Sequence, residues 1–549
     1  MTAERTYGPM PQEAEHVHPR ARFEILGAIL LTLFLSALDQ TIVGTALPRI
    51  VTDLGGNELY TWVVTVYLVT STVTGPMYGK LSDQFGRRPL IMIGVGLFLL
   101  GSLLSSLSGS MWQLILFRGI QGLGAGAIFP ISLAVIGDLF SPRERGKYQG
   151  LFGAVFGVSM IIGPALGGFL TDSISWHWVF LVNLPIGLIA LFVLARLLPH
   201  TSHPERRHKV DYLGAAVFTA AVIPILLGLT NKQSGEWTDP LVGGLIAVGV
   251  LLTGIFLWIE SRAAEPMLPL SLFRNRAVAV SLAAAALISF GFFGSVIFIP
   301  RWFQFVQGSS ATLSGYQMMP MLIGVIGASI LSGFIVSRTG RYKWMIAGAM
   351  ALAGLGLYLL TGVTGDTSIP SLWIGMFIAG VGIGPTMAVF TIVVQSAVAP
   401  AMMGAATSSL TFARQVGGTI GLALAGTIFG SSLTSELPGR LLAAGVPQPL
   451  VDGFTRAGGG ALDTGEITGV GIDLGAKILS SVPAPARPQV EPFIPNIVDG
   501  IYQAFSVAIG HAIWLGVAAA VLGAALLVFG MPQLHLRRHV GDGPAPMAE

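Results

Sequence analysis

Apolar segments of about 20 residues recur from end to end of this 549-residue chain, and this pattern constrains the fold more than any other feature. A helix of about 20 residues crosses the ~30 Å hydrocarbon core of a bilayer. Charged residues make up 10% of the chain, whereas a soluble protein carries about 25%. A soluble protein with several buried helices would need more charge elsewhere. We therefore expect an all-α polytopic membrane protein.

Apolar runs and the breakers between them predict fourteen transmembrane helices. The predicted ranges are 23–47, 60–79, 90–108, 112–136, 147–171, 178–197, 211–230, 241–260, 277–300, 314–336, 344–363, 370–396, 404–430 and 501–529. An even number of spans places both termini on one side. With that side cytoplasmic, most of the 30 lysines and arginines fall in cytoplasmic segments. Basic loops stay inside, so we expect both termini in the cytoplasm.

The sequence lacks cysteine and the short motifs of several common enzyme classes. It has no cysteine, which excludes disulfides, thiolate metal sites and cysteine nucleophiles. It also lacks a G-x-x-x-x-G-K-[ST] phosphate loop, H-E-x-x-H and G-x-S-x-G. His16 and His18 could bind a metal, but two histidines in a polar tail are more often solvated. We expect no enzyme activity, no cofactor, no metal and no nucleic-acid partner.

The polar stretch GKLSDQFGRRP interrupts two apolar runs and has a partial second copy. Its notable residues are Gly79, Asp83, Gly86, Arg87 and Arg88. The stretch SGFIVSRTGRYK repeats two glycines and an arginine at the same spacing, with Ser337 in the place of Asp83. Each copy follows the second helix of a six-helix half. Internal duplication is typical of transporters, and it predicts a 6+2+6 arrangement.

This duplication divides the chain into a tail, two bundles and an insertion. The expected parts are a cytoplasmic tail (1–22), a six-helix bundle (23–197), a linker (198–275) with extra helices at 211–230 and 241–260, five helices of the second bundle (276–430), a long extracytoplasmic loop (431–500), the last transmembrane helix (501–529) and a cytoplasmic tail (530–549). We expect the long loop to form a partly ordered cap with short helices. It could dock an outer partner, shield the exit, or be a tolerated insertion without a role.

Five stretches in order carry a resemblance to a known family. They are LDQTIVGTALPRI, GKLSDQFGRRP, RGIQGLGAG, GAVFGVSMIIGPALGG and WHWVFLVNLPIG. The chain resembles the major facilitator superfamily, specifically the fourteen-helix drug:proton antiporters of the QacA/EmrB type. The resemblance implies a monomer in the bacterial cytoplasmic membrane that exports small lipophilic substrates in exchange for protons. Some relatives export lipids, so a lipid exporter is the alternative. A non-transporting sensor or scaffold is a third class.

Two opposite charges are predicted at similar depth in the first bundle. Asp39 lies roughly 12 Å and Arg118 roughly 9 Å from the outer ends of their helices at 1.5 Å per residue. Buried charges in a membrane usually face a partner or a cavity. We hypothesise that they pair and that Asp39 carries the proton, although a purely structural pair is also conceivable. Gln121 and Tyr67 lie at a similar depth and could hydrogen-bond the pair. Alternatively, they could form ordinary hydrogen bonds between helices.

Two further polar residues fall inside predicted spans of the second half. Arg414 has no obvious acidic partner and could face the cavity or bind helix carbonyls. His511 could take part in coupling, but a lone histidine in a span is more often a packing residue. Both are candidate cavity residues. The predicted helix 314–336 contains no acid, so we expect no strong preference for dications.

Asp83 and the glycines of the helix 147–171 are candidate conformational elements. In the resembled family this aspartate helps to lock the two bundles, and here its candidate partner is the backbone near Met403–Gly404. A topology signal alone would explain the basic residues but not Asp83. The glycine–proline motif, which marks antiporters in the resembled family, comprises Gly163, Pro164, Gly167 and Gly168. It could form a pliable gate against the other bundle or only a packing face.

Overall fold

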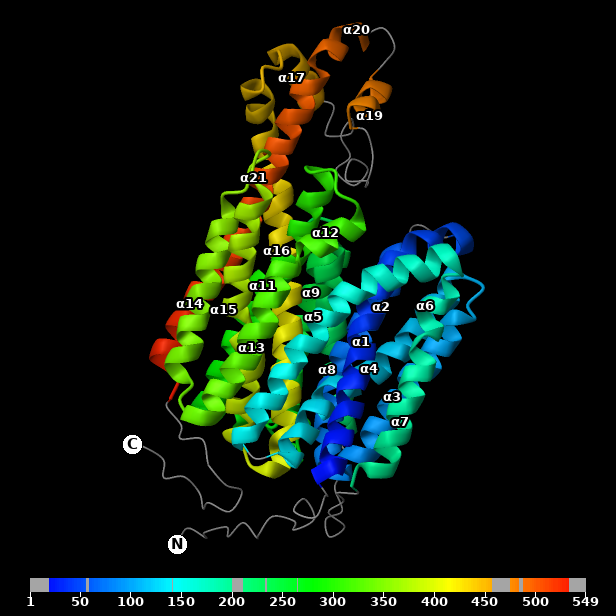
Figure 1. Ribbon diagram of the computed structural model, residues 1–549, viewed down its shortest axis with the longest axis vertical. Helices are drawn as coiled ribbons and strands as arrows, with labels where there is room; N and C mark the ends of the chain where they lie inside the picture. The colour runs from blue at the N-terminus through cyan, green and yellow to red at the C-terminus, as the bar shows by residue number, and fades with distance from the viewer. Residues whose placement is uncertain are drawn as a thin grey trace.

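The computed structural model describes residues 19–55, 59–140, 142–199, 211–232, 235–263, 265–456, 474–482 and 487–532 (Figure 1). Its described residues form helices and connecting turns, and no strand occurs among them. Thirteen of the described helices are long and apolar enough to cross a membrane. The chain is therefore a multi-pass, all-helical membrane protein. The terminal tails (1–22 and 530–549) lie largely outside the described residues.

The first half of the chain forms one bundle. Its helices are α1 (Pro19–Leu54), α2 (Tyr60–Phe85), α3 (Arg87–Ser106), α4 (Met111–Leu139), α5 (Pro142–Ser173) and the pair α6 (His177–Leu181) and α7 (Asn183–Leu197). The last two together form one candidate span. The core of this bundle is apolar and runs between α1, α3, α4 and α7.

The helix α2 is not among the thirteen candidate spans, although it is 26 residues long. Five threonines and two serines lower its mean hydropathy. Their hydroxyl groups bond to carbonyls of the same helix: Thr70 Oγ1 donates to Val66 O at 2.8 Å and Thr74 Oγ1 to Thr70 O at 2.8 Å. Hydroxyl groups satisfied in this way are tolerated in hydrocarbon. The hydropathy of α2 thus understates how well its backbone and side chains suit a membrane.

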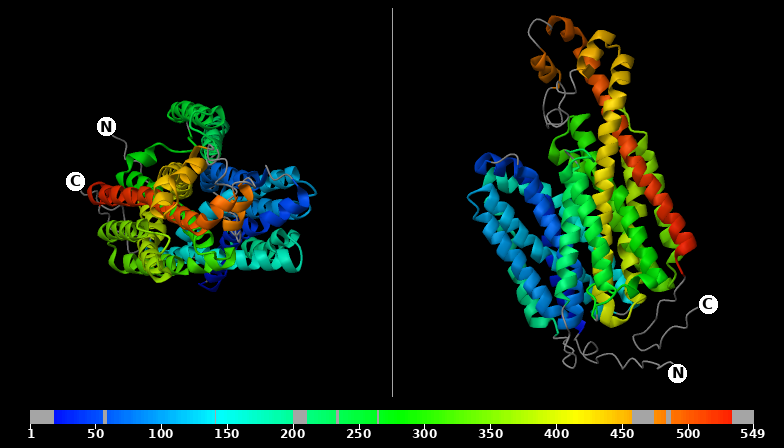
Figure 2. Two further views of the ribbon diagram at one scale, coloured as in Figure 1. Left: turned by 90° about the horizontal axis from the view of Figure 1, so that it is seen from above. Right: turned by 180° about the vertical axis from the view of Figure 1, so that it is seen from behind.

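The second half forms another bundle with its own core. It consists of α11 (Arg276–Phe305), α12 (Ala311–Gln317), α13 (Met319–Thr339), α14 (Lys343–Thr361), α15 (Ile369–Ser396), α16 (Met403–Ala443) and α21 (Ile494–Gly530), with the single turns α10 (Ser271–Arg274) and η4 (Pro400–Met402). In Figures 1 and 2 the two bundles approach each other at the end where α1 begins and α21 ends, and they diverge toward the opposite end. We call these the tail end and the cap end.

A helical hairpin joins the two bundles in sequence and packs beside both. It consists of α8 (Tyr212–Asn231), a π-helical turn η3 (Pro240–Gly244) and α9 (Leu245–Glu260). Phe218 of α8 packs with Val69 and Val73 of α2 and contacts Phe412 of α16. The hairpin therefore covers the seam where α2 of one bundle meets α16 of the other, and Figure 2 shows it projecting from the side of the molecule.

Two helices extend far beyond a bilayer at the cap end. The helix α16 has 41 residues and α21 has 37, so α16 is roughly 60 Å long against ~30 Å of hydrocarbon. The sequence predicted ends at 430 and 501, so part of the expected loop (431–500) is helix. The short helices α17 (Gln448–Arg456), α19 (Leu474–Ser481) and α20 (Arg487–Val490), followed by the turn η6 (Glu491–Phe493), pack on these extensions around an apolar core. The glycine-rich stretch 457–473 lies outside the described residues.

Candidate functional site

A buried ion pair lies inside the first bundle between α1 and α4. Arg118 Nη1 lies 2.5 Å from Asp39 Oδ2, and the two side chains are 1% and 0% exposed. The structure thus brings together the two charges that the sequence places at similar depth. A charged group in hydrocarbon costs at least ~2.5–3.5 kcal/mol, and a partner at this distance offsets that cost. The pair is closed off from solvent on all sides.

Amide side chains complete the hydrogen bonding of this pair. Gln121 accepts from Arg118 Nη1 at 2.7 Å and donates from Nε2 to Asp39 Oδ1 at 2.7 Å. Asn183, at the start of α7, donates to the same Asp39 oxygen at 3.3 Å and to Ser102 Oγ at 3.0 Å. Besides the salt bridge, Asp39 therefore accepts hydrogen bonds from two helices, α4 and α7.

Tyr67 of α2 lies against the guanidinium group and not against the carboxylate. The Arg118 guanidinium carbon lies 4.2 Å from the centre of the Tyr67 ring, within the range of a cation–π interaction. The Tyr67 hydroxyl lies 3.3 Å from Ser36 Oγ of α1. Both Gln121 and Tyr67 thus contact the pair, as their depth in the sequence suggests.

Close approach of α3 and α4 positions Gln121 and is possible because α3 has a glycine there. A Cβ on Gly101 would lie 2.4 Å from the backbone nitrogen of Gln121. On the other side of α4, a Cβ on Gly122 would lie 2.5 Å from Tyr67 O. Small residues at these two contacts let three helices converge on Arg118. The RGIQGLGAG stretch therefore packs the site as well as supplying its charge.

At the tail end, Asp83 of α2 contacts the first turn of α16 in the other bundle. The backbone N–H groups of Gly404 and Ala405 donate to Asp83 Oδ1 at 2.9 Å and Oδ2 at 2.8 Å. A carboxylate at a helix N-terminus meets unpaired N–H groups and the positive end of the helix dipole. Gly79 allows this approach, because a Cβ there would lie 2.6 Å from Gly404 O.

Arg87 fixes Asp83 from within the first bundle. Its Nη1 lies 2.5 Å from Asp83 Oδ1, and its Nε lies 2.9 Å from Asp138 Oδ2 at the end of α4. Gly86 makes the turn between α2 and α3 with a φ of 92°, a backbone angle that favours glycine. Arg88 instead donates to Ala195 O of α7. The polar stretch 79–89 therefore ties α2, α3, α4 and α7 together and presents one carboxylate to α16.

A second bond between the bundles lies close to Asp83. Gln395, at the end of α15, donates from Nε2 to Leu133 O of α4 at 3.0 Å and to Thr407 Oγ1 of α16 at 3.2 Å. The repeat copy behaves differently: Ser337 Oγ donates to Phe334 O of its own helix. The inter-bundle contact of the first copy thus has no equivalent bond at Ser337.

The glycines of α5 face two different neighbours. Cβ atoms on Gly153 and Gly157 would meet Ser329 and Ile326 of α13, in the other bundle. By contrast, Cβ atoms on Gly163 and Gly167 would lie 2.0 Å from Thr41 Oγ1 and 2.2 Å from Thr45 Oγ1, both on α1 of the same bundle. Gly168 has no atom within 4 Å of such a Cβ, and Pro164 lies within the unbroken helix. The motif residues Gly163 and Gly167 therefore pack α5 onto α1.

Arg414 and His511 lie in the second bundle, apart from the ion pair. Arg414 is buried, and its Nη2 donates to Thr386 O and Met387 O of α15 at 2.9 and 3.1 Å. Its Nε has no hydrogen-bond partner, and no carboxylate pairs with it among the described residues. His511 is exposed on α21, and its Nδ1 lies 3.2 Å from Ser432 Oγ.

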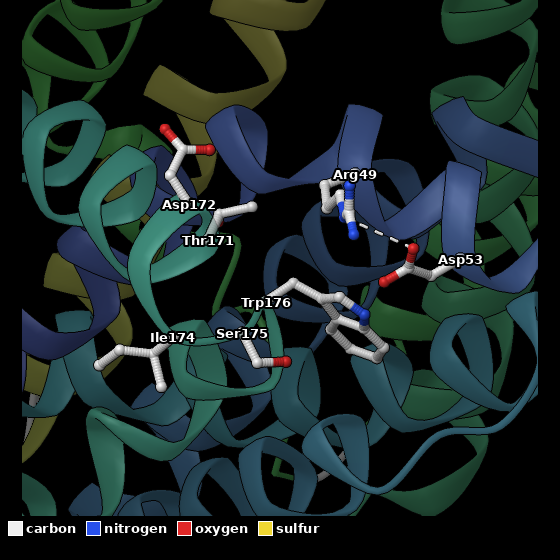
Figure 3. Close-up of a pocket in the computed structure, with 7 residues that line it drawn as sticks. All are labelled: Arg49, Asp53, Thr171, Asp172, Ile174, Ser175 and Trp176. Carbon is white, nitrogen blue, oxygen red and sulfur yellow. Dashed lines mark ion pairs between the residues drawn. The ribbon is translucent and has the colours of Figure 1, made fainter.

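A pocket of about 300 Å³ opens at the cap end of the first bundle (Figure 3). It is lined by Arg49, Asp53, Thr171, Asp172, Ile174, Ser175 and Trp176. Arg49 Nε lies 3.5 Å from Asp53 Oδ1 at its edge. Arg49 follows Asp39 by ten residues on α1, which is roughly 15 Å along the helix. The pocket thus lies on the cap-end side of the ion pair and does not contain it.

Four residues that the site uses could not be singled out from the sequence. Asn183 donates to Asp39, and Ser102 accepts bonds from Asn183 and Gln121. Asp138 holds Arg87, and Gln395 bonds across the bundles. Asn183 and Ser102 were detectable only as polar residues within apolar spans. Asp138 lies near the end of a predicted span, and that position does not show what it faces.

Comparison with known proteins identifies the family. Residues 29–422 match the Major Facilitator Superfamily. The chain is 39% identical over 420 residues to the multidrug transporter protein MdtP of Bacillus subtilis, covering 75% of this chain and 77% of that protein. It is 37% identical over 417 residues to multidrug resistance protein 3 of the same organism, covering 76% and 81%.

A solved structure shows the same fold. The proton:xylose symporter XylE aligns with a TM-score of 0.55 at 16% identity, covering 94% of this chain and 98% of that one. At this identity the likeness shows the fold alone. The chain belongs to the Major Facilitator Superfamily and is a membrane transport protein, not an enzyme.

Proposed function

We propose that the chain is a proton-coupled efflux antiporter that exports lipophilic and amphiphilic compounds by alternating access. The relatives named as multidrug transporters support drug efflux. In this proposal the tail end is cytoplasmic, as the lysine and arginine distribution favours, and the membrane is the bacterial cytoplasmic membrane. The helix α2 is a fourteenth span, which makes the arrangement 6+2+6. The protein works as a monomer, with protons, small lipophilic substrates and membrane lipids as its partners.

The single observation that carries proton coupling is the sealed pair of Asp39 and Arg118. Both are charged groups in hydrocarbon, and each is neutralised only by the other. A proton delivered to Asp39 would remove the attraction to Arg118 and leave the arginine with Gln121 and the Tyr67 ring. Proton binding would therefore change the packing between α1 and α4, which is how a proton gradient can drive a conformational change.

The Asp83 contact supports an outward-facing state. Its bonds to Gly404 and Ala405, with the Gln395 bond to Leu133, hold the bundles together at the tail end. The bundles diverge at the cap end (Figure 1). Release of Asp83 would then accompany the change to the inward-facing state. In this proposal the charges of Lys80 and Arg88, at the tail end, attract anionic lipid headgroups.

Transport in proteoliposomes tests the function. Purified protein is reconstituted with an acidic lumen, in which the pH gradient drives uptake through inverted molecules, and a panel of dyes and drugs is followed by fluorescence. We expect uptake that collapses when nigericin removes the gradient. Uptake of no compound under any gradient would contradict efflux, and uptake that survives nigericin would contradict proton coupling.

Export of lipids or lipid-like molecules is the second candidate. The extended α16 and α21 and their cap support it, because they continue the second bundle far beyond the bilayer. A surface of this length could shield an acyl chain on its way out or dock an outer partner. Deletion of the cap (444–493) distinguishes lipid export from drug efflux. If the chain exports lipids through the cap, lipid export would be lost in this variant. If the chain is a drug efflux protein, dye export would persist.

A further inference from the structure

The α8–α9 hairpin brings two carboxylates together at the tail end. Asp211 precedes α8 and Glu260 ends α9. Asp211 Oδ1 accepts from Gly214 N at 2.7 Å, which caps the start of α8. Glu260 Oε1 accepts from the backbone N–H of Leu268, in the segment that follows α9. One oxygen of each carboxylate is therefore satisfied by a backbone donor.

The remaining two oxygens meet beside Gly214. Asp211 Oδ2 and Glu260 Oε2 are both buried, and neither has a hydrogen-bond donor among the described residues. A Cβ on Gly214 would lie 2.3 Å from the first and 2.9 Å from the second. Both oxygens therefore border the same small space beside Gly214, and Glu260 is only 2% exposed. Two acceptor atoms thus face each other with no donor between them.

No neighbouring basic group among the described residues forms an ion pair with these two carboxylates. Lys80 of α2 is the basic group that acts on Glu260 electrostatically, but no lysine or arginine of the described residues forms an ion pair with either carboxylate. Glu265, after α9, adds a further acid and accepts from Gln84 Nε2 of α2 at 2.9 Å. Two ionised carboxylates in contact and out of water repel strongly, and one of them then holds a proton.

We propose that Asp211 and Glu260 share one proton and form a protonation site separate from Asp39 and Arg118. The described residues contain no group of three metal ligands here or elsewhere, so a proton is the occupant we assign. A proton between Oδ2 and Oε2 gives each oxygen a hydrogen-bond partner. It also joins the start of α8 to the end of α9.

The position of this site connects it to the contact between the bundles. Gln84, which bonds Glu265, follows Asp83 directly on α2. Phe218 of α8 lies against α2 and contacts Phe412 of α16. When the pH at the tail end rises, the shared proton is lost and the ends of the hairpin repel. The hairpin then packs less firmly on α2 and α16, so this seam is firmest at lower pH on that side.

Infrared spectroscopy of the full-length protein in nanodiscs tests the shared proton. Protonated carboxyl groups have a C=O stretch that shifts on deuterium exchange. At neutral pH we expect such a band in the wild type, its loss in both Glu260→Gln and Asp211→Asn, and its retention in Asp39→Asn. Glu236→Gln, at the cap end of the same hairpin, is the matched control and should also retain it. A band unchanged in Glu260→Gln and Asp211→Asn would overturn the proposal.

Thermal unfolding as a function of pH gives a second readout that does not depend on transport. The midpoint of the wild type should fall as the pH rises through the titration of the pair. In Asp211→Asn, where an amide donates in place of the proton, this fall should be lost. A parallel fall of the midpoint in Asp211→Asn and the wild type would overturn the proposal. In the infrared experiment, a carboxyl band that depends on sodium concentration and not on pH would overturn it as well. Failure here would leave proton-coupled efflux untouched, because that function rests on Asp39.

Discussion

Asp83 of the first bundle accepts a 2.9 Å hydrogen bond from the backbone N–H of Gly404, 321 residues later in the chain and in the second bundle. The bond joins a fixed carboxylate to a helix N-terminus. Arg87 holds the carboxylate in place, while Gly79 lets the two helices approach. Because neither partner lies on a flexible loop, breaking this contact requires the bundles themselves to separate.

Asp83→Ala should shift the protein toward the inward-facing state. Hydrogen bonds to a charged group contribute about 1.5–3 kcal/mol, and each 1.4 kcal/mol changes the population ratio tenfold. We expect the population ratio to change by about tenfold or more. The chain contains no cysteine, so spin labels can be placed at Arg196→Cys and Thr339→Cys at the tail end. Double electron–electron resonance should then show a longer distance in Asp83→Ala.

The repeat copy supplies the control for this experiment. Ser337 occupies the position equivalent to Asp83 but bonds only to Phe334 O of its own helix among the described contacts. Ser337→Ala should therefore leave the label distance unchanged. An identical distance distribution in Asp83→Ala and the wild type would show that the contact does not hold the bundles together.

Asp39→Asn should abolish proton coupling, and a double variant separates coupling from packing. The amide keeps a side chain of the same shape next to Gln121 but leaves Arg118 without a carboxylate. Breaking a buried pair costs about 3–5 kcal/mol, so the single variant should also unfold at a lower temperature. In Asp39→Asn/Arg118→Gln the stability should largely return, because no unpaired charge remains.

Substrate-dependent proton flux in proteoliposomes gives the second measurement for these variants. It should be absent in both the single and the double variant if Asp39 carries the proton. Recovery of proton flux together with stability in the double variant would contradict that role and leave a purely structural pair.

The depth of charged residues could be predicted from the sequence, but their lateral neighbours could not. Asp39 and Arg118 are placed at matching depth by counting along two helices, because the rise per residue is fixed. The rotation of α3 and α7 about their axes is not fixed in this way. Asn183 therefore reaches Asp39, and Ser102 reaches Asn183 and Gln121, for reasons of packing that no local pattern shows.

Helix ends were misplaced where tertiary contacts stabilise polar residues. The sequence predicts that the second span ends at 79, before Lys80 and Asp83, yet α2 continues to Phe85 because Asp83 is bonded by α16 and Arg87. Likewise α16 continues past Pro438 to Ala443. There Leu441 packs with Ile497 and Ile501 of α21, and this burial offsets the hydrogen bond that a proline removes.

Gly167→Ala should destabilise the protein, whereas Gly168→Ala should not. A Cβ at position 167 would lie 2.2 Å from Thr45 Oγ1 and 2.9 Å from Ile42 O, so α5 must move away from α1. Overpacking of this kind costs about 1–3 kcal/mol. At position 168 a Cβ meets no atom within 4 Å, and alanine favours a helix over glycine by about 1 kcal/mol.

Thermal unfolding and dye transport check these two glycine variants side by side. We expect a lower midpoint and slower transport only for Gly167→Ala. Equal midpoints in the two variants would contradict the α1–α5 packing described above. Equal transport with a lower midpoint would show that this contact stabilises the bundle without serving the conformational change.

Arg414→Met should alter which substrates are transported without destabilising the protein. Its guanidinium is buried, lacks a carboxylate partner among the described residues and leaves Nε unbonded. Removing an unpaired charge from hydrocarbon relieves a cost of ~2.5–3.5 kcal/mol, which offsets the two bonds to α15 carbonyls that are lost. A fixed positive charge attracts anionic substrates and repels cationic ones. We therefore expect export of an anionic amphiphile to fall about tenfold, as the loss of ~1.4 kcal/mol implies, while export of a cationic dye is unchanged or faster.

The matched control for this charge is Arg301→Met, which removes an exposed arginine near the cap end of α11. It changes the net charge equally and should change neither substrate. If Arg414 only joins α16 to α15, Arg414→Met should instead lower the thermal midpoint and slow both substrates to the same extent. Paired transport and unfolding measurements on the two variants therefore separate charge selection from helix packing, because only charge selection treats the two substrates differently.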